Sequence, residues 1–511
     1  MEINAIIHTL VHHMLDLLKY QPEAPMLFNS GLFLILFLCF IPIYYALRHR
    51  QMARIIYVVL FSLYFYYKSS GAYAAIIILT ATVDFLVGRR ISLASGQGKK
   101  WWLLVSIVFN LGMLGYFKYT GFLYNTFGPL FYGVGEWLGW VSTPFEPHQF
   151  DIFLPVGISF FTFQSMSYVI DIYRGEIKPL RKWVDYLFYV SFFPQLVAGP
   201  IVRAKDFIPQ IYRTPVVTRE EFGEGLYLIL FGLLKKGVIS DYISLNFVDR
   251  VFDAPSLYTG FENLMAVYGY SLQIYCDFSG YSDIAIGIAL WLGFRFNINF
   301  NFPYQSATIT EFWRRWHISL SSWLRDYLYI SLGGNRKGKL RTYINLLITM
   351  LLGGLWHGAS LRFIIWGGLH GLALALHKWL LSFVGFLRPT GKGMNPIVRL
   401  FSVLLTFHFV AFAWIFFRME NLSDVWVMLD MIAHEFHPEV AGQFIVGYKV
   451  VSILMAIGFL VHFTPAVVRR NIQGFVTRLP LVGQAMLLAI VFIILVQFRS
   501  IGVQPFIYFQ F

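Results

Sequence analysis

Long apolar runs separated by short basic connections constrain the fold of this chain more than any other feature of its sequence. Of the 511 residues, 57% are hydrophobic and only 13% are charged, and the mean hydropathy is +0.62. A soluble domain carries about a quarter charged residues, so most of this chain cannot face water. Many runs reach the ~20 residues that a helix needs to cross a bilayer, and they do not alternate as barrel strands would. The sequence therefore predicts an all-α, polytopic integral membrane protein.

The apolar runs predict about 11–12 transmembrane helices, with re-entrant or interfacial helices between some of them. The runs lie near residues 27–47, 55–67, 72–87, 101–117, 152–173, 225–249, 263–292, 343–360, 361–380, 398–417, 449–468 and 481–498. Residues 183–202 are also apolar, but Pro194, Gly199 and Pro200 interrupt them. Irregular backbone at membrane depth must be buried in protein or line a cavity, so this segment is predicted to form a re-entrant hairpin.

The formal net charge of +13 is distributed as in a membrane protein. Lys and Arg cluster in the short connections between apolar runs, which is typical of cytoplasmic loops. Segments 119–151 and 419–448 contain neither residue, so we expect them on the outer side of the membrane. Outside the predicted spans the sequence shows no basic face interleaved with aromatic residues, so we expect no nucleic-acid partner.

Residues 1–25 form a segment of different character from the rest of the chain. Their apolar side chains fall on one face at helical spacing and their polar side chains fall opposite, which predicts an amphipathic helix on the membrane surface. His8, His12 and His13 are metal ligands in principle, but we interpret them as part of the solvated face. Residues 26–511 are predicted to form a single membrane domain with a catalytic core at about 263–380.

Two histidines stand out in the second half of the chain. His317 lies in a run rich in Trp and Arg, and His357 lies in an apolar run beside Gly354 and Gly358. An imidazole in a membrane segment costs desolvation energy, so it is usually functional or paired with a polar neighbour. Its ordinary pKa near neutrality suits general base catalysis. From the residues alone, catalysis and a packing role bonded to a neighbouring carbonyl both remain open for His357.

Other polar residues carry weaker signals. Asp277 and Asp283 lie in an apolar run, where carboxylates must be paired, protonated or facing a polar cavity. Lys235 and Lys236 lie inside another run; they are candidates for contact with donor phosphates, and the interpretation we prefer is that they snorkel or that the membrane span starts there. The two cysteines, at positions 39 and 276, show neither disulfide nor metal-ligand spacing, and we expect no metal site.

Several phrases of the sequence resemble one known family. They are FWRRWHISLSSWLRDYLYI from Phe312, GGLWHGA from Gly353, LPVGISFFTFQSMSYVIDIYRG from Leu154, FFPQLVAGPIVR from Phe192, YCDFSGYSDIAIG from Tyr275 and the final PFIYFQF. Over residues 26–511 the chain is similar to the membrane-bound O-acyltransferases (MBOAT), in their bacterial alginate O-acetylation branch. The resemblance implies the MBOAT fold with a central tunnel, and O-acyltransferase activity.

The resemblance also implies roles for single residues. His357 matches the family's nearly universal histidine and would be the general base on the incoming hydroxyl. His317 occupies a position where relatives carry Asn, Asp or His, and would polarise the thioester carbonyl, position the donor or relay a proton. Arg314, Arg315 and Arg325 are candidates for binding donor phosphates, although a basic cytoplasmic face would contain them anyway. The tryptophans of this run, at positions 313, 316 and 323, we interpret as interfacial anchors.

We therefore expect an acyltransferase that takes an acetyl group from a cytoplasmic donor, acetyl-CoA, with no permanently bound cofactor. It would pass the group across the bacterial inner membrane for O-acetylation of an exported polysaccharide such as alginate. The resemblance implies that a periplasmic or membrane-anchored serine-type acetyltransferase completes the transfer. The alternatives are a transporter or flippase of glycan precursors, a non-catalytic scaffold and, within the family, peptidoglycan O-acetylation or teichoic acid D-alanylation.

Overall fold

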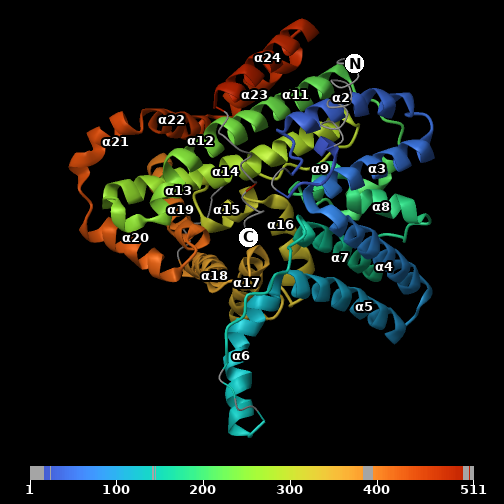
Figure 1. Ribbon diagram of the computed structural model, residues 1–511, viewed down its shortest axis with the longest axis horizontal. Coiled ribbons are helices and arrows are strands. Elements are labelled where there is room, and N and C mark those ends of the chain that lie inside the picture. The colour runs from blue at the N-terminus through green and yellow to red at the C-terminus, as the bar shows by residue number, and fades with distance from the viewer. Residues whose placement is uncertain are drawn as a thin grey trace, which may run out of the picture. The chain divides into compact units, whose positions relative to one another are not determined.

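The computed structural model describes residues 16–22, 25–140, 143, 145–383, 395–498 and 506 (Figure 1). The predicted amphipathic helix at 1–25, with its three histidines, lies almost entirely outside these residues, as does the PFIYFQF ending apart from Phe506. Throughout the described ranges the regular structure is helical and no strand occurs, which confirms the all-α prediction. The chain divides into two compact units, residues 1–215 and 216–511, and each is described in turn.

The first unit is a bundle whose core lies between neighbouring helices. Helix α4 packs against α5, α7 and α8, and α3 packs against α8 and α9. The buried carboxylate of Asp84 on α4 accepts hydrogen bonds from Ser106 Oγ (2.6 Å) and Asn110 Nδ2 (2.8 Å) on α5, so the helix pair is joined by polar as well as apolar contacts. The helices are α2 Gly31–Ala46, α3 Gln51–Ser70, α4 Ala74–Leu93, α5 Gln97–Leu114, α6 Thr120–Trp137, α7 Ile158–Arg174, α8 Trp183–Ser191, α9 Phe193–Leu196 and α10 Ala204–Ile211.

The segment predicted to form a re-entrant hairpin is interrupted in the structure. Helix α8 ends at Ser191, Phe192 leaves the helical conformation, and the single turn of α9 follows. The backbone N–H of Phe193 donates to Ser62 Oγ (3.1 Å), which satisfies one of the groups freed by the break. Most side chains of α8 and α9 are buried within the protein.

The second unit is organised around α14, a helix of 32 residues that is buried along most of its length. A capping box begins it, in which Thr259 and Glu262 each accept a backbone N–H of the other. Figure 1 shows α11 beside α14, and the two helices pack extensively against each other. The helices are α11 Arg219–Leu233, α12 Asp241–Ile243, α13 Asp249–Asp253, α14 Gly260–Trp291, α15 Ile309–Arg315, α16 Ile318–Trp323, α17 Gly338–His357, α18 Leu361–Phe383, α19 Pro396–Arg418, α20 Leu422–His434, α21 Ala441–Gly447, α22 Lys449–Phe463, α23 Ala466–Arg478 and α24 Leu481–Phe498.

Glycines allow α11 and α14 to approach each other closely. A Cβ added to Gly232 on α11 would lie 2.5 Å from the carbonyl oxygen of Gly280 on α14, and one added to Gly287 would lie 2.6 Å from the carbonyl of Gly225. No real side chain fits such distances, so these backbones are in direct contact, as in membrane helix pairs built on small residues. After α11 the chain continues through two π-helical segments, 234–240 and 244–248, into α13.

The number of membrane spans differs from the sequence prediction. Within the described residues, five helical segments are long and apolar enough to cross a membrane: Gln51–Leu93, Gln97–Trp137, Leu361–Ser382, Pro396–Arg418 and Leu481–Phe498. A helix pair bent by 100°, Pro438–Gly447 with Lys449–Phe463, gives a sixth if it is one span. The sequence predicted about 11–12 spans; Gln51–Leu93 contains two of them, as α3 and α4, and α14 and the helical segment 219–253 are not among the five.

Candidate functional site

His357 is the last residue of α17, and Gly358 after it is extended. Its side chain is buried, with 3% of the residue exposed, and its ring centroid lies 5.0–5.2 Å from those of Trp356, Trp366 and Phe417. The contact of α17 with α18 fixes this place, because a Cβ on Gly354 would lie 2.1 Å from a backbone carbonyl of α18. The imidazole is therefore held in an aromatic cage at the end of a tightly packed helix pair.

His317 lies between α15 and α16 and is fully buried, with 0% exposed. Its φ of +42° places it in the left-handed region, where residues with a Cβ are uncommon and often functional. Its Nδ1 faces the side-chain oxygen of Asn299 at 3.3 Å, and its ring meets Phe278 edge-on at 4.6 Å. Burial lowers the pKa of the His317 imidazole to about 3, so the ring is neutral at physiological pH.

One indole connects the two predicted histidines. The ring centroid of Trp356 lies 5.0 Å from that of His357 and 6.1 Å from that of His317. The structure therefore brings together two residues that the sequence places on different elements. Both belong to the second unit, and both lie within the predicted catalytic core at about 263–380.

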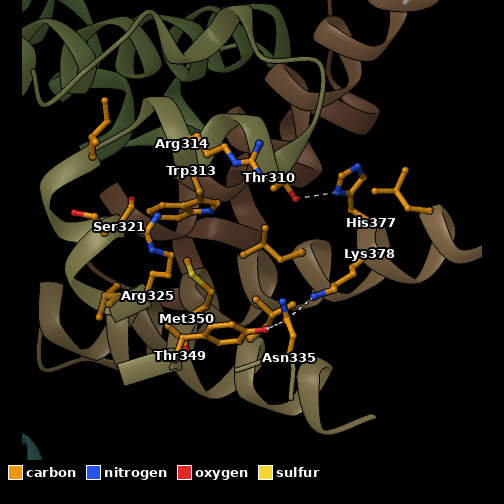
Figure 2. Close-up of a pocket in the computed structure, with 17 residues that line it drawn as sticks. Thr310, Trp313, Arg314, Ser321, Arg325, Asn335, Thr349, Met350, His377 and Lys378 are labelled. Carbon is orange, nitrogen blue, oxygen red and sulfur yellow. Dashed lines mark hydrogen bonds between the residues drawn. The ribbon is translucent and has the colours of Figure 1, made fainter. Parts of the chain in front are cut away.

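A cavity of about 560 Å³ opens beside these elements (Figure 2). Its volume is in the range of small-molecule sites, and its lining combines apolar side chains with three cationic ones, Arg314, Arg325 and Lys378. A neighbouring cavity of about 350 Å³ shares Lys378 and adds Lys339. The lining of the larger cavity consists of Thr310, Trp313, Arg314, Ile318, Ser321, Ser322, Leu324, Arg325, Tyr329, Asn335, Leu346, Thr349, Met350, Leu374, His377, Lys378 and Leu381.

Hydrogen bonds hold the polar side chains of this cavity in place. Figure 2 shows Thr310 bonded to His377, with 2.9 Å between Oγ1 and Nδ1, and Lys378 Nζ donating to Asn335 Oδ1 at 2.7 Å. The hydroxyl of Tyr329 donates to the same amide oxygen. Helix α18 thus contributes two adjacent polar residues, and the loop before α17 contributes Asn335, which orients the ammonium group toward the cavity.

Aromatic contacts lead from this cavity to the buried imidazole of His357. Trp313 lines the cavity and its ring lies 5.7 Å from that of Trp366. Trp366 in turn lies 5.1 Å from the ring of His357. His370, fully buried, fills the angle between the two indoles at 5.1 and 4.8 Å. The cavity and the histidine are therefore separated by a thin layer of aromatic rings.

The other cationic candidates lie elsewhere. Arg315, adjacent to Arg314, does not line the cavity: it pairs with Glu311 at 2.7 Å. Lys235 pairs with Asp283, and its Nζ donates to Ser279 Oγ at 3.0 Å. Lys236 pairs with the two carboxylates of its surroundings, Asp241 at 2.8 Å and Asp277 at 2.5 Å.

These ion pairs decide two interpretations made from the sequence. The side chains of Lys235 and Lys236 are 7% and 6% exposed, so the interpretation that they snorkel to the interface is wrong. Asp277 and Asp283 are paired, as their burial required. Of the five cations named as phosphate candidates, Arg314 and Arg325 line the 560 Å³ cavity.

Two of the three tryptophans predicted to be interfacial anchors lie in a different environment. Trp316 and Trp323 are buried inside the unit, at 1% and 5% exposure, so they are core residues and not interfacial anchors.

Sequence reasoning missed Lys378 and Asn299. Lys378 follows a long apolar run beside His377, which is a weak signal, and Asn299 lies in a loop whose return to His317 no local pattern predicts. Among the described residues, no three or more His, Cys, Asp or Glu side chains gather as metal ligands would.

Comparison with known proteins decides the family. The membrane-bound O-acyltransferase family matches residues 180–416, which contain both histidines and the lining of the cavity. A protein of Pseudomonas aeruginosa named "Probable alginate O-acetylase AlgI" is 40% identical over 79% of this chain and 74% of its own length. The chain belongs to the membrane-bound O-acyltransferase family. This MBOAT protein is thus a multi-pass membrane O-acyltransferase that takes an acyl donor, and the transporter alternative is set aside.

Other relatives of this MBOAT protein carry different acceptors in their names. A peptidoglycan O-acetyltransferase of Helicobacter pylori is 36% identical, over 78% of each chain. A teichoic acid D-alanyltransferase of Bacillus subtilis is 28% identical, over 59% of this chain and 78% of the relative. Identity to the two acetyl-transferring relatives is therefore higher and extends over more of the chain.

Proposed function

We propose that this protein moves an acetyl group from acetyl-CoA on the cytoplasmic side of the bacterial inner membrane to a hydroxyl of an exported polysaccharide such as alginate. The observation that carries the proposal is the meeting of two buried imidazoles at Trp356, beside a cavity with a cationic lining. Acetyl rather than alanyl transfer is supported by the names of the more similar relatives. A serine-type acetyltransferase on the outer side would receive the group or complete the transfer.

The chemistry follows from the groups present. The acceptor hydroxyl gives its proton to His357 as its oxygen attacks the thioester carbonyl carbon, forming a tetrahedral intermediate. Collapse of the intermediate breaks the carbon–sulfur bond, and the proton held by His357 passes to the departing thiolate. The products are the acetyl ester and CoA thiol, and the imidazole is returned to its starting form. The aromatic cage around His357 keeps water from competing with the hydroxyl.

The cationic cavity is assigned to the phosphates of the donor. Arg314 and Arg325 line it from the α15–α16 side and Lys378 lines it from α18; Arg325 also pairs with Asp326 at 2.6 Å. Phosphate groups bind such clusters through charge-assisted hydrogen bonds. The apolar remainder of the lining, on α17 and α18, suits the uncharged arm of a thioester donor.

The decisive experiment compares wild type with His357→Ala at matched membrane abundance. Acetyl release from labelled acetyl-CoA and the O-acetyl content of secreted glycan should both fall at least about 100-fold, as expected when a general base is removed. His408→Ala is the matched control, because that exposed histidine on α19 bonds only Tyr268 and its own helix. Retained acetylation in the His357→Ala protein would refute the assignment.

A further inference from the structure

Asn299 contacts three consecutive residues, from His317 to Ser319. Its backbone carbonyl accepts the N–H of Ile318 at 2.8 Å, and its side-chain oxygen accepts the N–H and the hydroxyl of Ser319 at 3.1 and 2.9 Å. The same oxygen faces His317 Nδ1 at 3.3 Å. Asn299 is itself buried, with 1% exposed. One residue, distant in sequence, thus supplies the acceptors at the start of α16 and holds His317 in its left-handed conformation.

The orientation of the Asn299 amide follows from these partners. A backbone N–H can only donate, so the atom that faces Ser319 N must be the amide oxygen and not the nitrogen. The amide nitrogen then points to α14, where it donates to Ser282 Oγ at 3.2 Å. The oxygen and nitrogen of an asparagine are otherwise hard to tell apart, and here the backbone decides between them.

The tautomer of His317 follows in turn. An amide oxygen has no proton to give, and the single hydroxyl proton of Ser319, whose Oγ lies 3.5 Å from Nδ1, is donated to Asn299 Oδ1 at 2.9 Å. The imidazole therefore donates from Nδ1. In a neutral ring the second nitrogen, Nε2, then carries the lone pair. Among the described residues, the rings that pack against His317 include Phe278 on α14, Phe300 in the preceding loop and Trp356 on α17, and none of these three carries an ionisable group.

We infer that Asn299 is a positioning residue that holds His317 as the Nδ1–H tautomer, so that Nε2 serves acetyl transfer as a hydrogen-bond acceptor. This inference rests on the proposed function and narrows it. A neutral Nε2 with a lone pair cannot donate to the thioester carbonyl, so His317 does not polarise the donor. It accepts instead, which suits a role in orienting the acceptor hydroxyl or another proton-bearing group of the reactants.

The tautomer is tested without any reaction. Nitrogen-15 NMR of the full-length protein, labelled at histidine, is recorded for wild type and for His317→Gln, whose missing signals identify those of His317. The expected spectrum shows a pyrrole-like Nδ1 and a pyridine-like Nε2. A pyridine-like Nδ1 in the folded protein would overturn the inference, whatever the activity of the protein. Full activity of His317→Ala would instead refute the role of His317 while leaving the tautomer standing.

The catalytic consequence is tested with two variants of Asn299. Asn299→Leu removes the acceptor, and we expect acetyl transfer to fall about 10- to 100-fold at every pH, by analogy with the loss seen when the partner that orients a metal-ligating imidazole is removed. Asn299→Asp keeps the acceptor and adds a negative charge, which favours the imidazolium and turns Nε2 into a donor. The Asp variant should therefore be active at high pH and should lose activity on acidification where wild type does not.

Ser282→Ala is the control, because it removes the partner of the amide nitrogen and leaves the oxygen untouched. We expect its rate to lie within about twofold of wild type, with an unchanged pH profile. If Asn299→Asp instead gains activity on acidification, Nε2 acts as a donor and the inference is wrong. Equal losses in the Leu and Asp variants with wild-type pH profiles would reduce Asn299 to a structural residue and would also overturn it.

Discussion

Two adjacent arginines on α15 provide a direct test of the donor site. Arg314 lines the 560 Å³ cavity and is exposed, whereas Arg315 is turned away and pairs with Glu311, its NH1 also donating to the carbonyl of Asn301 at 3.2 Å. We expect Arg314→Gln to weaken binding of acetyl-CoA and Arg315→Gln to leave it almost unchanged. The two variants make the same change of charge and side chain, one residue apart.

The expected magnitude follows from the environment of Arg314. Two unit charges at ~4 Å attract by about 1 kcal/mol in water and about 4 kcal/mol near a protein surface with an effective dielectric constant of ~20. Because Arg314 is exposed, the lower part of this range applies, and we take about 1–2 kcal/mol. That free energy corresponds to a rise in Kd of about 5- to 30-fold. Arg315→Gln removes an ion pair within one helix, which contributes only about 0.3–0.5 kcal/mol to stability.

The assay is a titration of acetyl-CoA against purified protein in lipid nanodiscs at low and high salt. Screening reduces attraction between exposed charges, so wild-type binding should weaken as salt rises, and Arg314→Gln should show a smaller dependence. A Kd for Arg315→Gln as high as that for Arg314→Gln would refute the placement of the donor phosphates. So would a wild-type Kd that does not change with salt.

Three further outcomes are expected, each measured by thermal or denaturant unfolding in detergent. Gly354→Ala should destabilise the protein by about 1–3 kcal/mol and reduce transfer, because the added Cβ would lie 2.1 Å from a backbone carbonyl oxygen. Gly353→Ala is the control and should have little effect, because its Cβ would meet a leucine methyl group at 3.1 Å. Lys236→Met leaves buried carboxylates unpaired and should cost about 3–5 kcal/mol, and adding Asp277→Asn should recover part of this loss. Burial lowers the pKa of His317 to about 3, so as the pH falls below ~6.5 the unfolded chain binds a proton at this residue and the folded protein does not. Between pH 7 and pH 5 the free energy of unfolding of wild type should therefore fall by about 1–2 kcal/mol more than that of His317→Gln. An equal fall in the two proteins would contradict this prediction.

Hydropathy predicted the helices well and their environments poorly. The predicted spans 343–360 and 398–417 match α17 and α19 to within a few residues, because a long apolar run specifies a helix locally. The runs that hold Lys235, Lys236, Asp277 and Asp283 also form helices, but their charged residues face one another between α11 and α14. A sequence window averages over the helix surface, so it does not distinguish a helix that faces lipid from one that faces another helix.

The sequence was enough to select the two histidines of the candidate site, but not to predict that they lie close together. His317 and His357 stand out because each is a polar residue in an apolar setting. Their meeting at Trp356 depends on the return of the loop before α15 and on the close contact of α17 with α18, which involve residues far apart in the chain. Asn299 could not have been identified by spacing, since eighteen residues and one helix separate it from its partner.

Charged side chains in the second unit are distributed differently at the α11–α14 contact, around the two histidines and along the cavity. Where α11 and α14 meet, each buried lysine is matched by carboxylates, so that contact is polar but presents no unopposed charge. Around His317 and His357 the neighbours include aromatic rings and an uncharged amide, which leave little room for water. The positive side chains that line the cavity are separated from His357 by the rings of Trp313 and Trp366. Under the proposed function this arrangement holds the anionic part of the donor apart from the base, and a base in a dry site favours attack by a hydroxyl over hydrolysis.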